Sequence, residues 1–197
     1  MTNPTQVVQQ WYSNFLNWDS ATHDYDTHIG ITPVAPLLKD KDVLNLGCFY
    51  PNIELALAAK AKSWHAIDFT PEVIDRCRAF TQLIGIVKFE VMDMRYLELP
   101  ANAFNVVLDL SSGDHLAFDD YMLALDEISR VLQPSGLFIT TYANADVIGG
   151  EIEKWGPWGY ERRICPVNLQ AILEQKGFSL MLKDDSSSRA GMVCIKR

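Results

Sequence analysis

Residues 43–51 read Val-Leu-Asn-Leu-Gly-Cys-Phe-Tyr-Pro. Residues 43–46 are mostly apolar, as in a buried strand, and Gly47 opens the short loop that follows. Residues 53–60 then predict a helix. A buried strand that ends in a glycine turn before a helix is typical of nucleotide-binding α/β sheets. The turn lets a ligand approach the backbone, and the helix end offers unpaired N–H groups.

The second predicted strand, residues 64–68, ends in an acidic residue. Asp68 lies about twenty residues after Gly47, the usual spacing for a carboxylate that accepts hydrogen bonds from ribose hydroxyls. An acid at a strand end can also simply cap the next helix. Thr70 and Pro71 can already serve as the N-cap and first residue of that helix, 71–83, so the ribose role is favoured for Asp68.

An acid also follows the third predicted strand. Residues 87–92 alternate in polarity, and Asp93-Met94 comes next. A carboxylate can accept a hydrogen bond from an exocyclic amine while an apolar neighbour covers a ring. The alternative is a plain turn residue.

The fourth predicted strand, residues 104–110, is nearly all apolar, as in the centre of a parallel sheet. The loop after it contains Asp114 and His115, at the edge where open α/β sheets bind ligands. We expect this polar pair to face a substrate. Loop solvation or packing of His115 on a neighbouring helix is the alternative. A helix from Asp119 or Asp120 through Leu132 and a fifth strand at 137–142 follow.

Composition narrows the class of protein. The 197 residues are 48% hydrophobic and 21% charged, as in one ordinary globular domain. The net charge is −8 and no Lys or Arg cluster interrupts it, so nucleic acid is not an expected partner. No apolar run reaches membrane-spanning length, and the N-terminus lacks a signal pattern, so we expect a cytoplasmic protein with no membrane partner.

The thiols and imidazoles predict no metal site. Cys48, Cys77, Cys165 and Cys194 form no Cys-x-x-Cys pair, and free thiols are expected. The four histidines, His23, His28, His65 and His115, show no metal-ligand spacing.

These segments together resemble the class I S-adenosylmethionine-dependent methyltransferases. The first motif of that family has an acidic residue, one spacer and then Gly-x-Gly-x-Gly. The corresponding residues here are Asn45, Gly47, Phe49 and Pro51, so only the first glycine is kept. Residues 130–136, Arg-Val-Leu-Gln-Pro-Ser-Gly, are similar to the family's Arg-Val-Leu-Lys-Pro-Gly-Gly before the fifth strand. The resemblance spans residues 37–197.

The resemblance implies a fold and a domain organisation. The expected fold is a three-layer α/β sandwich with a doubly wound, mostly parallel seven-stranded sheet, closed by an antiparallel C-terminal hairpin from 178–182 and 192–196. Residues 1–197 would form a single domain, with 37–197 as the nucleotide-binding core and 1–36 as an N-terminal helical lid.

The resemblance also implies a cofactor, S-adenosylmethionine, with the adenine amino group at Asp93 and a lid tyrosine, Tyr25, over the methionine part. The cofactor-binding residues expected are Tyr25, Asn45, Gly47, Cys48, Asp68, Phe69, Asp93, Met94 and Asp109.

The acceptor side is expected between Asp114-His115 and an irregular loop at 143–165. His115 would orient or deprotonate a small-molecule acceptor at N or O. Trp158 and Tyr160 could wall an apolar pocket, and Arg162 or Arg163 could hold a carboxylate. Ordinary loop packing is the alternative for each of these residues.

Three functions fit the sequence. The first is an active small-molecule methyltransferase, which intact Asp68 and Asp93 favour. The second is a catalytically inactive relative that acts as a binding or partner subunit, which Phe49 and Pro51 favour. The third, a nicotinamide-dependent oxidoreductase, is disfavoured because the loop lacks the second and third glycines that a pyrophosphate needs.

Overall fold

A computed structural model describes residues 32–80, 85, 87–156 and 159–197 of the chain. Most of the predicted 1–36 helical lid, with Tyr25, and the predicted pocket residue Trp158 lie outside the described residues.

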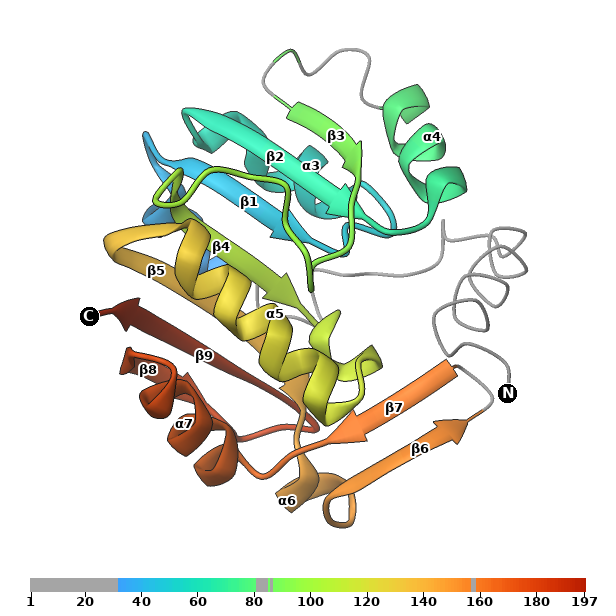
Figure 1. The fold of residues 1–197 in the computed structure, drawn as a ribbon, viewed down its shortest axis with the longest axis vertical. Coiled ribbons are helices and arrows are strands. Elements are labelled where there is room, and N and C mark those ends of the chain that lie inside the picture. The colour runs from blue at the N-terminus through green and yellow to red at the C-terminus, as the bar shows by residue number, and fades with distance from the viewer. Residues whose placement is uncertain (1–31, 81–84, 86, 157–158) are drawn as a thin grey trace.

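A seven-stranded sheet forms the centre of the fold, with strand order β3-β2-β1-β4-β5-β9-β8 (Figure 1). Strands β1 to β5 run parallel, and β9 pairs antiparallel with both β5 and β8. This confirms the predicted mostly parallel sheet with its closing hairpin. The strands of this sheet are β1 (Asp42–Leu46), β2 (Ser63–Asp68), β3 (Val87–Val91), β4 (Phe104–Leu110), β5 (Leu132–Ala143), β8 (Phe178–Asp184) and β9 (Arg189–Lys196).

Helices cover both faces of the sheet because its strands are apolar on both sides. In β1, Leu44 and Leu46 pack in one apolar core with α5 and α7, and Val43 packs in a second core with α3 and α4. Figure 1 shows α5 and α7 on the same side of the sheet. The helices and 3₁₀ turns are η2 (Thr32–Leu38), α3 (Asn52–Leu57), η3 (Ala58–Lys60), α4 (Pro71–Phe80), η4 (Gly113–His115), α5 (Phe118–Val131), α6 (Ala145–Ile148) and α7 (Pro166–Gln175).

The prediction of an irregular loop at 143–165 was wrong. The segment contains α6 and a separate two-stranded hairpin, β6 (Ile152–Gly156) and β7 (Gly159–Arg163). Cross-strand pairs such as Trp155 with Tyr160 hold the hairpin together. The two short runs at 152–156 and 159–163 carried this signal in the sequence.

The turn before the fifth strand also differs in detail from the prediction. The strand begins at Leu132, directly after α5, and its pairing with β4 shifts register between Phe104 and Val106. Ser135 adopts φ +61 there. Gly136 is required by close packing, because a Cβ at this position would lie 2.9 Å from the Gln133 carbonyl oxygen.

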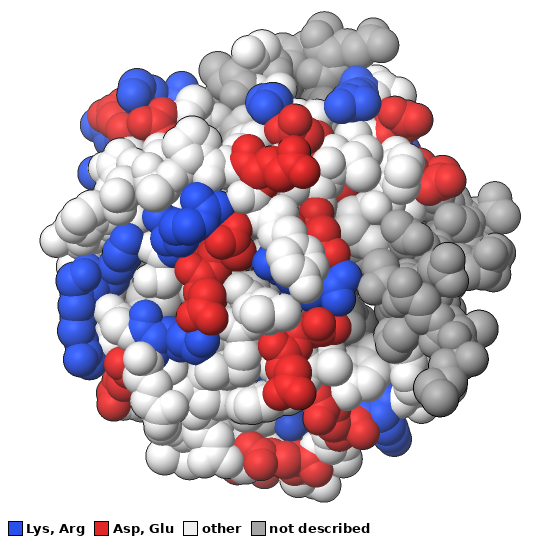
Figure 2. Space-filling view, in the orientation of Figure 1, with Lys and Arg blue, Asp and Glu red and all other residues white. Residues whose placement is uncertain are grey.

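Acidic and basic side chains lie next to one another across the face in Figure 2. No helix in the described part of the chain combines the length and apolarity needed to cross a membrane. Among the same residues, no group of three or more His, Cys, Asp or Glu side chains could hold a metal ion. All four cysteines are free thiols.

Candidate functional site

The carboxyl ends of β1 to β4 meet at one edge of the sheet, since these strands are parallel (Figure 1). The strand order reverses between β1 and β4, the position at which open α/β sheets bind ligands. Gly47 lies at this point with φ +64, and a Cβ there would lie 2.4 Å from Ser112 Oγ. The Ser112 hydroxyl contacts the carbonyl oxygens of Leu46 and Gly47 at 2.8 and 3.2 Å. The loops after β1 and β4 therefore pack directly on one another.

The turn after Gly47 keeps a left-handed residue although the second glycine of the family motif is absent. Phe49 adopts φ +42, a conformation that costs a non-glycine residue roughly 1–2 kcal/mol. The Phe49 N–H donates to Asp68 Oδ2 at 3.2 Å, and its carbonyl oxygen accepts from the Cys77 thiol at 3.9 Å. The Cys48 and Cys77 sulfurs lie 3.9 Å apart in the same contact. These partners hold Phe49 in the conformation that glycine adopts more easily.

Asp68 lies at the end of β2 with only 4% of its surface exposed. Its carboxylate accepts from the backbone N–H groups of Phe49 and Thr70, at 3.2 and 2.9 Å. Burial raises the pKa of Asp68 to about 6. Two hydrogen bonds use about half of the acceptor capacity of a carboxylate, so further donors can be accepted. Phe69 follows, half-buried, at the same strand end.

Asn45, in contrast, points into the core between β1 and α3. Its Nδ2 donates to Glu54 Oε1 at 2.6 Å, and Trp64 Nε1 donates to the same oxygen at 3.3 Å. Glu54 has no exposed surface, and burial raises its pKa to about 7. Sequence reasoning missed Glu54, although a lone acid in the apolar run at 53–59 marks it.

Asp93 follows β3 and is held by a neighbour that sequence reasoning also missed. Arg95 binds the Asp93 carboxylate through Nε and Nη2, and its Nη1 reaches Asp120 Oδ2 at 3.0 Å in the first turn of α5. Met94 lies between them in sequence, and its Cε is 3.7 Å from the position that a Gly47 Cβ would take. The structure thus brings Met94 to the glycine turn.

The loop after β4 is shaped by two buried acids. Asp109 Oδ1 accepts from the N–H groups of Ser112 and Gly113, at 3.1 and 2.8 Å, and burial raises its pKa to about 6. Asp114 Oδ2 accepts from the Ala143 N–H at 3.0 Å and pairs with Arg189. The contacts of both carboxylates anchor the loop.

His115 faces the β6–β7 hairpin. Its Nδ1 lies 2.8 Å from the Tyr160 carbonyl oxygen. Because a carbonyl oxygen only accepts, Nδ1 carries the proton and Nε2 is the basic nitrogen of the neutral ring. This geometry suits a side chain that accepts a proton at Nε2.

The hairpin presents aromatic side chains and a buried cation. The Trp155 and Tyr160 rings meet edge to face at 5.4 Å, and Trp155 is 47% exposed. Arg162 donates to the Gly113 carbonyl oxygen at 3.0 Å and lies 4.0 Å from the Tyr121 ring centroid. Its Nε and Nη1 have no hydrogen-bond partner among the described residues. Trp155 was not among the predicted site residues, because its pairing with Tyr160 depends on the β6–β7 hairpin, which was not predicted.

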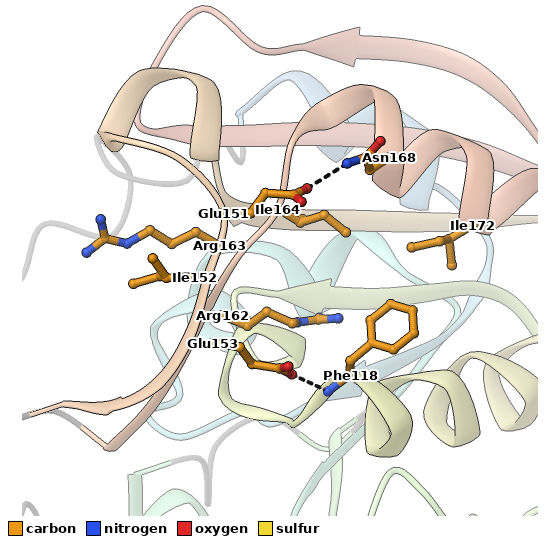
Figure 3. Close-up of a pocket in the computed structure, with 9 residues that line it drawn as sticks. All are labelled: Phe118, Glu151, Ile152, Glu153, Arg162, Arg163, Ile164, Asn168 and Ile172. Carbon is orange, nitrogen blue, oxygen red and sulfur yellow. Dashed lines mark hydrogen bonds between the residues drawn. The ribbon is translucent and has the colours of Figure 1, made fainter.

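A cavity of about 390 Å³ lies where this hairpin meets the N-terminal ends of α5 and α7 (Figure 3). In Figure 3, Arg162 extends from β7 toward Phe118, and Glu153 approaches the Phe118 backbone, whose N–H donates to its carboxylate. Glu151 accepts from Asn168 Nδ2 at 2.8 Å at the other end. The full lining consists of Phe118, Glu151, Ile152, Glu153, Arg162, Arg163, Ile164, Asn168 and Ile172.

The structure therefore brings most of the predicted residues to one edge. Gly47, Cys48, Asp68, Met94 and the loop after β4 surround the switch point. Asn45 faces the α3 side, and Arg162 ties the hairpin to that loop from the α5 side. The functional roles assigned to all of these residues stay predictions.

Comparison with known proteins identifies the same segments. A family model described as "Methyltransferase domain" matches residues 44–140, from β1 into β5. A search of curated proteins finds no match.

Solved structures match the whole fold at low identity. The 1,6-didemethyltoxoflavin-N1-methyltransferase of Burkholderia thailandensis, solved with 1,6-didemethyltoxoflavin and S-adenosylhomocysteine, aligns with a TM-score of 0.78 at 18% identity, over 100% of this chain and 91% of that one. The N-methyltransferase NodS of Bradyrhizobium japonicum, with S-adenosylhomocysteine, aligns with a TM-score of 0.76 at 16% identity, over 99% of each chain. The [4+2]-cyclase SpnF aligns with a TM-score of 0.80 at 16% identity, over 99% of this chain and 97% of that one.

Proposed function

We propose that this chain, whose residues 44–140 match a methyltransferase domain model, is a class I S-adenosylmethionine-dependent enzyme that methylates a nitrogen or oxygen atom of a small-molecule acceptor. Two of the similar structures are named as N-methyltransferases, and one of these holds 1,6-didemethyltoxoflavin. The observation that best supports a retained cofactor site is the Phe49 turn. Its φ of +42 and its bond to Asp68 keep the turn in a left-handed form without the second glycine.

The residues at the strand ends fit S-adenosylmethionine. Gly47 lets the loops after β1 and β4 meet at the strand ends, because Ser112 Oγ lies where a Cβ would stand. Asp68 retains acceptor capacity for the two hydroxyls of a ribose. Met94 provides an apolar surface next to the same turn. Phe69, Cys48 and Asp109 would shape the pocket around these groups, and Asn45 would support the turn from below through Glu54.

The bound cofactor supplies a sulfonium-activated methyl group. In this proposal the protein's residues align the acceptor and keep the site dry. The His115 tether to Tyr160 aims Nε2, which would take the proton of an acceptor that carries one. Asp114 would hold the loop that bears His115, and Trp155 and Tyr160 would exclude water. Arg162 would attract an acidic group of the acceptor, since its Nε and Nη1 have no hydrogen-bond partner among the described residues.

The second candidate is a relative that does not transfer methyl groups. Pro51, which has no N–H to offer at the third glycine position, favours it. Binding of S-adenosylhomocysteine to the purified protein shows whether the cofactor site is kept. A protein that has lost the site does not bind it. Methyl transfer to a panel of heteroaromatic amines and phenols then separates the active enzyme from the inactive one.

S-adenosylhomocysteine should stabilise the fold. At one hundred times its dissociation constant, the expected gain in the free energy of unfolding is about 2.7 kcal/mol. The measurement is the melting temperature as a function of ligand concentration. Homocysteine, which lacks the adenosine part, is the control. An unchanged melting temperature at millimolar ligand contradicts the proposal and favours the partner-subunit function.

Asp68→Ala should weaken cofactor binding. Loss of a hydrogen bond to a charged group costs roughly 1.5–3 kcal/mol, or about 10- to 150-fold in affinity. The variant should also melt earlier than the wild type, because Phe49 and Thr70 lose their acceptor. Calorimetry on the folded protein separates the two effects, with the exposed Asp75→Ala on α4 as control. Early melting with wild-type affinity shows that Asp68 only supports the turn.

A further inference from the structure

The acceptor sites of Asp93 are already used by one neighbour. Its Oδ1 accepts from the Arg95 backbone N–H at 2.9 Å and from Arg95 Nε at 3.0 Å. Its Oδ2 accepts from Arg95 Nε at 3.0 Å and from Nη2 at 2.6 Å. A carboxylate offers about four lone-pair sites, and these contacts, in which Nε shares its single hydrogen between both oxygens, leave little capacity for another donor. An exocyclic amine that approaches Asp93 therefore has to displace a donor.

The same guanidinium has a second carboxylate within reach. Arg95 Nη1 contacts Asp120 Oδ2 at 3.0 Å, on the first turn of α5. The Arg95 side chain is only 15% exposed, whereas those of Asp93 and Asp120 are 29% and 35% exposed. The partly buried Arg95 guanidinium thus lies between two carboxylates. If it moves away from Asp93, Asp120 still compensates its charge.

We propose that Arg95 competes with the adenine amino group for Asp93, and that cofactor binding moves the guanidinium onto Asp120. This inference rests on the proposed cofactor site. It makes Arg95 a residue that sets nucleoside affinity and base specificity. The backbone N–H bond to Asp93 can remain throughout, because only the Nε and Nη2 donors need to leave.

The competition has a chemical consequence for base recognition. Adenine presents an amino donor at its six position, and hypoxanthine presents an oxygen acceptor there. Hypoxanthine can accept from Arg95 while the Arg95–Asp93 pair stays intact. The wild type should therefore discriminate weakly between the two bases. A chain without the guanidinium should discriminate more strongly, because the adenine amino group can donate to Asp93, whereas the six-position oxygen of hypoxanthine cannot.

The test is calorimetric binding of S-adenosylhomocysteine and S-inosylhomocysteine to the full-length wild type, Arg95→Gln and Asp120→Asn. Arg95→Gln should bind S-adenosylhomocysteine roughly tenfold more tightly, by release of a charged competitor. The ratio of its affinity for S-adenosylhomocysteine to its affinity for S-inosylhomocysteine should rise by a similar factor relative to the wild type. Asp120→Asn should bind S-adenosylhomocysteine several-fold more weakly, because the displaced guanidinium has lost its second partner.

Two further variants keep the outcome interpretable. Lys88→Gln removes an exposed cation from β3 and should leave both affinities unchanged. Arg95→Lys keeps the charge without the planar fork, so it should also bind more tightly than the wild type if Arg95→Gln folds poorly. The inference would be overturned if Arg95→Gln and Arg95→Lys bind S-adenosylhomocysteine as tightly as the wild type or more weakly. It would also be overturned if Arg95→Gln and Asp120→Asn weaken that binding equally. Failure of every variant to bind S-adenosylhomocysteine would instead contradict the proposed function.

Discussion

His115→Ala should lower turnover by ~10²–10⁴-fold, the usual contribution of general base catalysis, while cofactor affinity stays unchanged. The reason is the orientation of the ring. Its Nδ1 donates to the Tyr160 carbonyl oxygen, so Nε2 is the nitrogen that can take a proton. The measurement is steady-state methyl transfer, with cofactor binding determined separately. A smaller effect that appears mainly in acceptor binding is expected if the acceptor is an already neutral amine.

His115→Asn is the matched control for this experiment. An asparagine amide can donate to the Tyr160 carbonyl oxygen in place of Nδ1, but it has no basic nitrogen. If His115 takes a proton, the asparagine variant should be as slow as the alanine variant. Recovery of turnover by asparagine would show that His115 only tethers the loop to the hairpin. Wild-type turnover and acceptor affinity in His115→Ala would place the acceptor elsewhere.

Glu54→Gln should remove a large part of the pH dependence of stability. The pKa of Glu54 rises from 4.5 to about 7 because the carboxyl is buried. Between these values the unfolded state has lost the proton and the folded state keeps it, so stability falls as pH rises through this window. At about 1.4 kcal/mol per pKa unit, the wild type should lose about 3 kcal/mol that the glutamine variant does not lose.

Urea unfolding at intervals from pH 4.5 to 7.5 measures this difference. The pKa values of Asp68 and Asp109 are also raised by burial, to about 6, and contribute with the same sign. Both are present in wild type and variant, so the difference isolates Glu54. Glu72→Gln, an exposed change on α4, should behave as the wild type does. Parallel curves for wild type and Glu54→Gln would show that Glu54 is ionised in the folded protein.

The candidate site was predictable where it depends on strand ends. Asp68 ends β2 and Asp93 follows β3, and parallel strands end at the same edge, so their neighbourhood follows from the order of elements. The partners of these acids were not predictable. Arg95 is two residues from Asp93, but its reach to Asp120 depends on how α5 packs over the sheet.

The sequence by itself indicated where the strands lie, because apolar periodicity and turn residues act locally. Its resemblance to the class I methyltransferases implied the seven-stranded sheet, the closing hairpin and the edge of the candidate site. Only the tertiary structure decided which side chains face that edge. Asn45 was expected at the cofactor but binds Glu54, since the carboxyl in α3 needs a donor once it is buried. Arg162 was expected to hold a ligand carboxylate, and its first partner is the Gly113 carbonyl oxygen, because the β6–β7 hairpin packs against the loop after β4. Such contacts join residues far apart in the chain, and the physical reason for each is the need to satisfy a polar group that packing has removed from water.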